Sequence, residues 1–134
     1  MIGNRKVDPN ADFAKESMTL LLGTTATGQT AKRVDAYTPG FAFKVVKVEV
    51  YALTVTATIS VDVQIGSTSV LSSAVTPVAD TPTAGTLSST TASLIGSATS
   101  VISLKYTSNG TGAATACYAR IWIRPQPMNG EVAQ

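Results

Sequence analysis

The chain has 134 residues, a length that fits one domain, and 44% of them are hydrophobic while only 13% are charged. The formal net charge of +2 is small, which excludes an intrinsically disordered chain, because such chains combine low hydrophobicity with high net charge. With no histidine and a single cysteine, Cys117, the sequence also excludes an intrachain disulfide, a Cys/His zinc site and histidine-based catalysis.

Residues 1–16 are polar and contain a block of mixed charge, NRKVDPNADFAKES. They lack the apolar segment of a secretory signal, so synthesis in a reducing cytoplasm is expected. We predict an N-terminal arm with two possible conformations, a short helix capped by Asn10 that includes Phe13 or an extended segment. A β domain is expected over residues 17–127 and a polar C-terminal tail over 128–134.

The first strands of the domain are short. Strands are expected over residues 17–22 and 33–37, on either side of a loop rich in glycine and threonine over 23–31. The second strand ends at Pro39–Gly40, a dipeptide typical of turns.

Residues 41–65 carry the strongest strand signal. Apolar residues occupy every second position over 55–65, which predicts one half-buried strand. Upstream, the doublet Val45–Val46 breaks the alternation that two phenylalanines begin, and indicates a β-bulge. No glycine or proline separates these two segments, so an unmarked turn and one long bent strand both remain possible.

The rest of the domain alternates loops with short strands. We expect a turn over 66–69, strands over 69–74 and 87–94 around a long loop over 76–86, and strands over 100–107 and 113–124. Asn109–Gly110 lies between the last two strands and predicts that they form a β-hairpin. Seven or eight strands with almost no helix indicate an all-β, single-domain fold, either a β-sandwich, a jelly roll or a Greek-key barrel.

Charge is distributed unevenly along the chain, since Asp80 and Lys105 are the only charged residues between Val63 and Ala119. This neutral, hydroxyl-rich stretch fits either a surface that packs against other subunits or the exterior of a Thr-rich sheet. Basic residues occur as separate pairs, so we expect no nucleic-acid partner. The apolar runs are far shorter than a membrane span, so we expect no membrane partner.

None of the sequence motifs predicts catalysis, a cofactor or a metal. Residues 23–30, GTTATGQT, resemble a phosphate-binding loop, but Gln29 replaces the lysine that such a loop needs. The acidic residues form no spaced pair or calcium loop. Cys117 lies on the apolar side of the last strand and is expected to be a buried structural thiol. We therefore expect a protein that is not an enzyme.

The polar side of the last strand is the candidate functional surface. It carries Tyr118, Arg120, Trp122 and Arg124 in alternation with apolar residues. Aromatic residues and arginine are common anchors of protein interfaces, and exposed aromatic rings also stack on sugars or bases. A third interpretation places Trp122 in a second layer of the core.

The layout of the whole chain resembles the small β-sandwich structural proteins of tailed bacteriophage virions, and head decoration (cement) proteins in particular. The similarity lies in the polar arm NRKVDPNADFAKES, a Thr/Ala/Val-rich β domain centred on VKVEVYALTVTATISVDVQIG, and the closing segment YARIWIRPQP. This resemblance implies a non-enzymatic protein that binds major capsid protein junctions on the virion exterior and stabilises the head shell. It also implies assembly as a homo-dimer or homo-trimer in the bacterial host cytoplasm.

The resemblance suggests which residues contact the shell. We expect arm contacts from Arg5, Lys6 and Phe13, and domain contacts from Tyr118, Arg120 and Trp122. Two other functions remain possible: a glycan- or receptor-binding module, or another virion part such as a head–tail connector or tail component.

Overall fold

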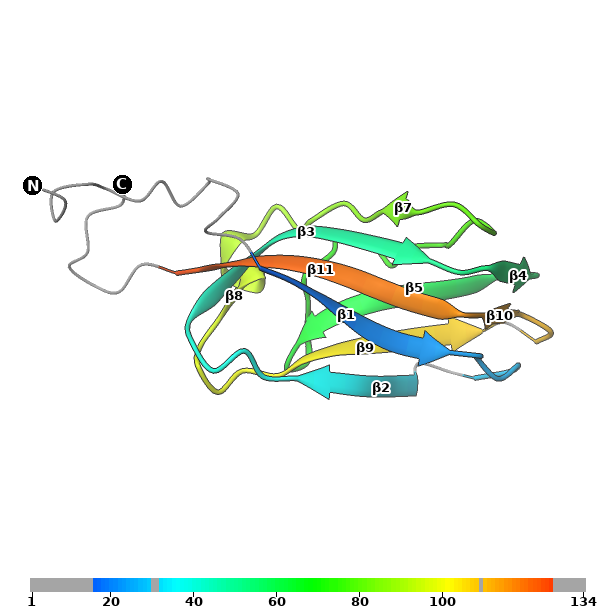
Figure 1. The fold of residues 1–134 in the computed structure, drawn as a ribbon, viewed down its shortest axis with the longest axis horizontal. Coiled ribbons are helices and arrows are strands. Elements are labelled where there is room, and N and C mark those ends of the chain that lie inside the picture. The colour runs from blue at the N-terminus through cyan, green and yellow to red at the C-terminus, as the bar shows by residue number, and fades with distance from the viewer. Residues whose placement is uncertain (1–15, 30–31, 109, 127–134) are drawn as a thin grey trace, which may run out of the picture.

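The computed structural model describes residues 16–29, 32–108 and 110–126. Its strands pair in an antiparallel manner in three sheets (Figure 1). The five-stranded sheet has the order β1 (Glu16–Gly23), β11 (Cys117–Pro125), β3 (Phe43–Tyr51) and β7 (Thr83–Ala84), with β8 (Ile95–Gly96) also on β3. The four-stranded sheet has the order β2 (Lys32–Tyr37), β9 (Ile102–Ser108), β5 (Ile59–Ile65) and β6 (Thr68–Ser69). A small two-stranded sheet pairs β4 (Thr54–Thr56) with β10 (Ala113–Thr115).

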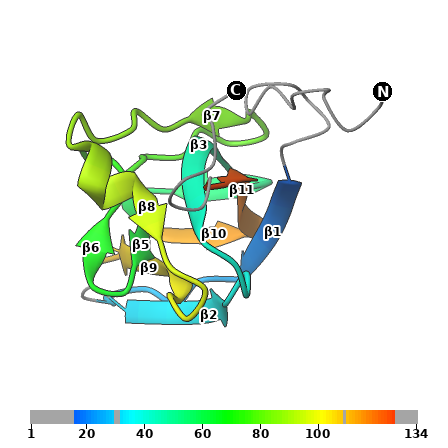
Figure 2. The same ribbon diagram turned by 90° about the vertical axis from the view of Figure 1, so that its left-hand side faces the viewer.

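The two larger sheets supply one shared hydrophobic core, around which the strands curve (Figure 2). Alternate residues of each strand face inward because side chains project to opposite sides of a strand in turn. The five-stranded sheet contributes Phe43, Val45, Val48, Val50, Ala119, Ile121 and Ile123, and the four-stranded sheet contributes Ile59, Val61, Val63, Ile102, Leu104 and Tyr106. The expected all-β, single-domain fold is therefore confirmed, while its assignment to a sandwich or jelly roll stays a prediction.

The predicted bulge at Val45–Val46 is confirmed. Val45 lies opposite Ile123 and Lys47 lies opposite Trp122, which leaves Val46 as the extra residue on β3. The extra residue shifts the alternation by one position. Residues on both sides of the bulge, Val45 and Val48, are therefore fully buried.

The prediction of one strand over residues 55–65 is wrong. The segment divides into β4 and β5 at Ala57, which is exposed and adopts a φ of 53°. A residue in this left-handed conformation interrupts the extended backbone, so the apolar residues before and after it do not lie on one face of a single strand. The chain uses β4 to cross from the five-stranded sheet to the four-stranded sheet (Figure 1).

The expected hairpin around Asn109–Gly110 is also wrong. Gly110 does adopt a φ of 50°, but β9 pairs with β2 and β5, whereas β11 pairs with β1 and β3. Between them, β10 carries the chain back from the four-stranded sheet to the five-stranded sheet. It ends at Thr115 and is followed by Ala116, which adopts a φ of 47°. The two crossing strands β4 and β10 pair with each other at one end of the domain (Figure 1).

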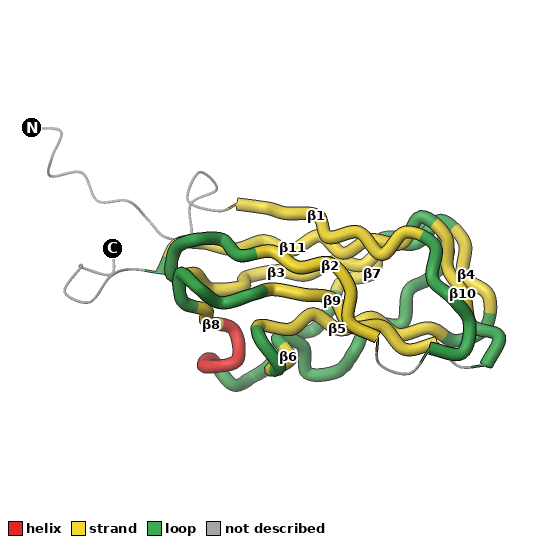
Figure 3. The backbone as a smooth tube through the Cα atoms, turned by 90° about the horizontal axis from the view of Figure 1, so that it is seen from below, coloured by secondary structure: helices red, strands yellow, loops and turns green. Residues whose placement is uncertain are grey.

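Three smaller differences occur between β5 and β9. The strand expected over residues 69–74 is reduced to β6 at its start, and Leu71 forms only an isolated bridge with Leu87. The short strand expected within residues 87–94 is absent, and this segment instead holds the 3₁₀ turn η3 (Thr91–Leu94), drawn in red in Figure 3. The long loop expected over 76–86 contains the short strand β7, which pairs with β3. Pairing with a distant strand therefore adds order that the local sequence does not indicate.

Substitution of Gly96 by alanine is expected to destabilise the fold. Gly96 is buried, and a Cβ atom built on it would overlap with the ring of Phe43 in the core. Overpacking of this kind costs about 1–3 kcal/mol. Urea unfolding should show this loss for Gly96→Ala and partial recovery in the double variant with Phe43→Leu. The exposed substitution Ala98→Ser serves as the control, and an unchanged stability of Gly96→Ala would contradict the contact.

Substitution of the two alanines that follow the crossing strands is expected to stabilise the fold. Ala57 and Ala116 hold left-handed backbone conformations, which cost a residue with a Cβ atom about 1–2 kcal/mol. Glycine avoids most of this cost but loses more entropy on folding. Ala57→Gly and Ala116→Gly should therefore each raise the free energy of unfolding by about 0.5–1 kcal/mol. Ala98→Gly, at an exposed position without a positive φ, should lower it in the same urea assay.

Candidate functional site

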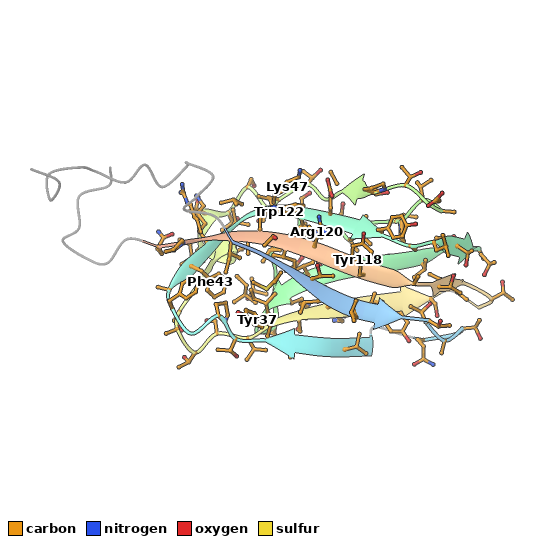
Figure 4. All side chains as sticks on the ribbon, viewed as in Figure 1. Tyr37, Phe43, Lys47, Tyr118, Arg120 and Trp122 are labelled. Carbon is orange, nitrogen blue, oxygen red and sulfur yellow. The ribbon has the colours of Figure 1, made fainter. Side chains whose placement is uncertain are left out.

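The outward-facing residues of β1, β11 and β3 form the candidate site, which we call the outer face. Their positions follow from the core, because every residue that alternates with a buried one points away from it. The outer face consists of Ser17, Thr19 and Leu21 on β1, Tyr118, Arg120, Trp122 and Arg124 on β11, and Lys44, Lys47, Glu49 and Tyr51 on β3. Figure 4 shows Tyr118, Arg120 and Trp122 in a row along β11, with Lys47 beside Trp122.

Trp122 lies at the centre of a group of cations. Lys47 sits opposite it on β3, with its Nζ atom 4.7 Å from the centroid of the indole ring, and the Cζ atom of Arg120 lies 5.8 Å from that centroid. Both distances fall within the range of a cation–π interaction. Trp122 is half-buried and does not belong to the hydrophobic core. The interpretation that placed it in a second core layer is therefore wrong.

Two tyrosines extend the aromatic row. Tyr118 and Tyr51 lie opposite each other on β11 and β3, and their ring centroids are 5.3 Å apart at an interplanar angle of 32°. Such offset pairs stabilise beyond their buried area. On the other side of Tyr118, Leu21 of β1 is 63% exposed. The end of the outer face near these residues is thus apolar and accessible.

Tyr51 is also held by a turn that packs beside β3. Its hydroxyl donates a hydrogen bond of 2.6 Å to Oδ1 of Asp80, and the backbone N–H of Asp80 donates to the carbonyl of Ala52 at 2.8 Å. The hydrogen bond to Asp80, followed by desolvation and the negative charge of Asp80, raises the pKa of Tyr51 above its ordinary value of 10.0. The bond thereby orients Tyr51 toward its contact with Tyr118.

The outer face is strongly cationic. Among its described side chains, Lys44, Lys47, Arg120 and Arg124 are positive and Glu49 is negative, a balance of four charges against one. The Nζ atom of Lys47 lies 3.4 Å from Oε2 of Glu49, in a partly exposed ion pair. The outward side of the central strands β5 and β9 differs, because it carries one charge of each sign, Asp62 and Lys105, in register.

The loop that resembles a phosphate-binding loop uses its backbone N–H groups within the fold. In its described part, the N–H of Gln29 donates to Oγ of Ser108 and the N–H of Thr25 donates to the carbonyl of Ala114, both at 2.9 Å. The hydroxyl of Ser108 in turn donates to the carbonyl of Ala26 at 2.8 Å. The loop is thus attached to the end of the domain where β10 begins, and these N–H groups do not point at a ligand.

Cys117 is buried, as predicted, on the inner side of β11. Burial raises the pKa of its thiol from 9.0 to about 11. Because the thiolate is the reactive form of cysteine, a thiol in this environment is inert at neutral pH. The described residues contain no group of three or more acidic or cysteine side chains suited to a metal ion.

The structure brings together the predicted domain residues Tyr118, Arg120 and Trp122 on one face. The predicted arm residues Arg5, Lys6 and Phe13 lie outside the described residues. Sequence reasoning missed the contribution of β3, whose Lys47 and Tyr51 complete the site. Their alternation with buried valines had marked them as outward-facing, but only the pairing of β3 with β11 places them beside Trp122 and Tyr118.

The hydrogen bond between Tyr51 and Asp80 gives a testable pH dependence. The pKa of Tyr51 is higher in the folded protein than its ordinary value of 10.0 in the unfolded chain. The hydrogen bond therefore contributes fully to the free energy of unfolding below pH 10. This contribution is lost as the pH rises through the pKa of the folded state. Absorbance titration of the phenolates should show one tyrosine with a raised pKa, which returns toward the ordinary value in Asp80→Asn. Tyr51→Phe should remove that titration, and Tyr37→Phe is the control. An unchanged titration in Asp80→Asn would disprove the bond.

Comparison with protein-family models, with curated proteins and with solved structures gives no match to this chain. Within the part of the chain that the structure describes, no helix has the length and apolar character needed to cross a membrane.

Proposed function

We propose that this protein is a non-enzymatic capsid decoration (cement) protein of a tailed bacteriophage, which docks on major capsid protein junctions through its outer face. The proposal rests on the resemblance in layout together with one structural observation. That observation is the partly exposed aromatic row of Trp122, Tyr118 and Tyr51, flanked by Lys47 and Arg120. Such a protein stabilises its partner by adding contact area and makes or breaks no covalent bond.

The chemistry of the outer face suits a protein interface. Tryptophan, tyrosine and arginine dominate the residues whose truncation weakens protein complexes. They bury much area and combine an apolar body with a polar end. Trp122 and Tyr118 are also held in place by Lys47 and Tyr51. Little side-chain entropy is therefore lost when a partner binds.

The remaining parts of the proposal concern assembly. Decoration would place many copies on the exterior of the virion, as homo-dimers or homo-trimers formed in the bacterial cytoplasm. An arm over residues 1–16 reaches at most about 50–58 Å when extended. In this proposal Arg5, Lys6 and Phe13 on that arm contact neighbouring subunits.

A glycan- or receptor-binding module is the alternative from another class, and a head–tail connector or tail component is the alternative within the virion. Sugar recognition by stacking needs an accessible ring, whereas the ammonium group of Lys47 lies over the ring of Trp122. The two neighbouring tyrosines already contact each other. These contacts favour a docking surface for protein over a sugar site.

Sedimentation with capsid shells tests the proposed function. The full-length protein is expected to co-sediment with shells of the major capsid protein from the same virion. Truncation of a central interface residue costs about 2 kcal/mol or more, so Trp122→Ala and Tyr118→Ala should each weaken binding by about thirtyfold. Deletion of residues 1–16 should weaken it as well.

The control is Thr107→Ala, an exposed substitution on the four-stranded sheet, opposite Ser60. It should bind as the unmodified protein does. Trp122→Ala and Tyr118→Ala also remove ring contacts within the fold, so their melting temperatures are measured to establish that both variants remain folded in the binding assay. Equal decoration by the Trp122 and Tyr118 variants would exclude the outer face as the docking surface. A monomeric protein that does not co-sediment with capsid shells, but whose melting temperature rises with added sugars, would favour the glycan-binding alternative.

A further inference from the structure

The outer face and the outward side of β5 and β9 differ in charge. On the outer face the described side chains carry four positive charges and one negative charge, whereas the outward side of β5 and β9 carries one of each. Complementary potentials direct partners to each other and suppress wrong ones. A partner that docks on the outer face thus gains most if its own surface is negative.

Arg120 is the cation best placed to contact a partner. It is exposed and lies beside Trp122 and opposite Glu49 of β3. The carboxylate of Glu49 contacts Lys47, and within the described residues the guanidinium of Arg120 forms no ion pair. Lys47, in contrast, already pairs with Glu49 at 3.4 Å. A planar guanidinium binds a carboxylate through two parallel hydrogen bonds, and nearby aromatic rings that exclude water strengthen such a pair.

We propose, on the basis of the proposed function, that the outer face binds an acidic protein surface. Carboxylates of the partner pair with Arg120 next to Trp122, while Tyr118 and the exposed side chain of Leu21 make the apolar contacts. The Lys47–Glu49 pair shows that a carboxylate is accommodated at this position on the face.

The same features argue against a nucleic acid as the partner. Non-specific binding to nucleic acid typically neutralises a series of phosphates and stacks bases on free aromatic rings. Here the carboxylate of Glu49 lies among the cations, and the rings of Tyr51 and Tyr118 already contact each other. An acidic protein surface, with discrete carboxylates between apolar groups, matches this arrangement better than a continuous phosphate backbone.

Trp122 is the only tryptophan of the chain, so its fluorescence reports binding at the outer face directly. We suggest titration of the full-length protein with poly-L-glutamate at about 0.1 M salt, where charges more than about 10 Å apart are largely screened. A saturable change in emission is expected. Arg120→Glu should weaken the binding by at least about tenfold.

The matched control is Lys105→Glu, which changes the net charge equally but lies on the four-stranded sheet. It should bind poly-L-glutamate within about twofold of the unmodified protein. Melting temperatures establish that both variants fold, and poly-L-lysine should leave the emission unchanged.

Three results would overturn the acidic-partner proposal: no response to poly-L-glutamate, equal losses in Arg120→Glu and Lys105→Glu, or tighter binding of duplex DNA through Arg120. Shell sedimentation separates this outcome from failure of the proposed function. If Trp122→Ala abolishes sedimentation while Arg120→Glu does not, docking stands and the acidic partner is excluded. If the protein binds poly-L-glutamate as expected but does not co-sediment with capsid shells, the decoration function is excluded instead.

Discussion

The burial of alternate residues on β11 is the constraint on which the rest of the structure depends. Ile121 and Ile123 are fully buried, and burial of each such side chain contributes about 1.5–3 kcal/mol. A shift of β11 by one residue would expose both isoleucines and bury Arg120 and Trp122 instead. Since β11 pairs with β1 on one side and β3 on the other, its register sets the register of the whole five-stranded sheet.

The chain crosses between the two larger sheets by the short strands β4 and β10. A crossing segment would leave backbone N–H and C=O groups without partners if it ran alone. Pairing of β4 with β10 satisfies these groups for both crossings at once. The loop before β2 adds to this end of the domain, because Ala114 and Thr25 exchange hydrogen bonds and Ser108 bonds with the backbone of Gln29.

The outer face combines rigidity with accessibility. Its aromatic side chains rest on a sheet whose inner side is packed, and they also contact neighbours across the strands. Rigid elements hold binding residues more precisely than loops do. Its described side chains carry a net positive charge, whereas the outward side of β5 and β9 carries one charge of each sign.

The amino-acid sequence by itself determined which residues face the core in most long strands, the bulge at Val46, and the outward position of Tyr118, Arg120 and Trp122. These features follow from local alternation, because successive side chains of an extended strand project to opposite faces and the apolar set of a long strand faces the core. Only the tertiary structure decided that β4 and β10 cross between sheets, and that Lys47 and Tyr51 join Trp122 and Tyr118. Strand partners far apart in the sequence are selected by total burial and backbone pairing across the domain, for which a local pattern carries no signal.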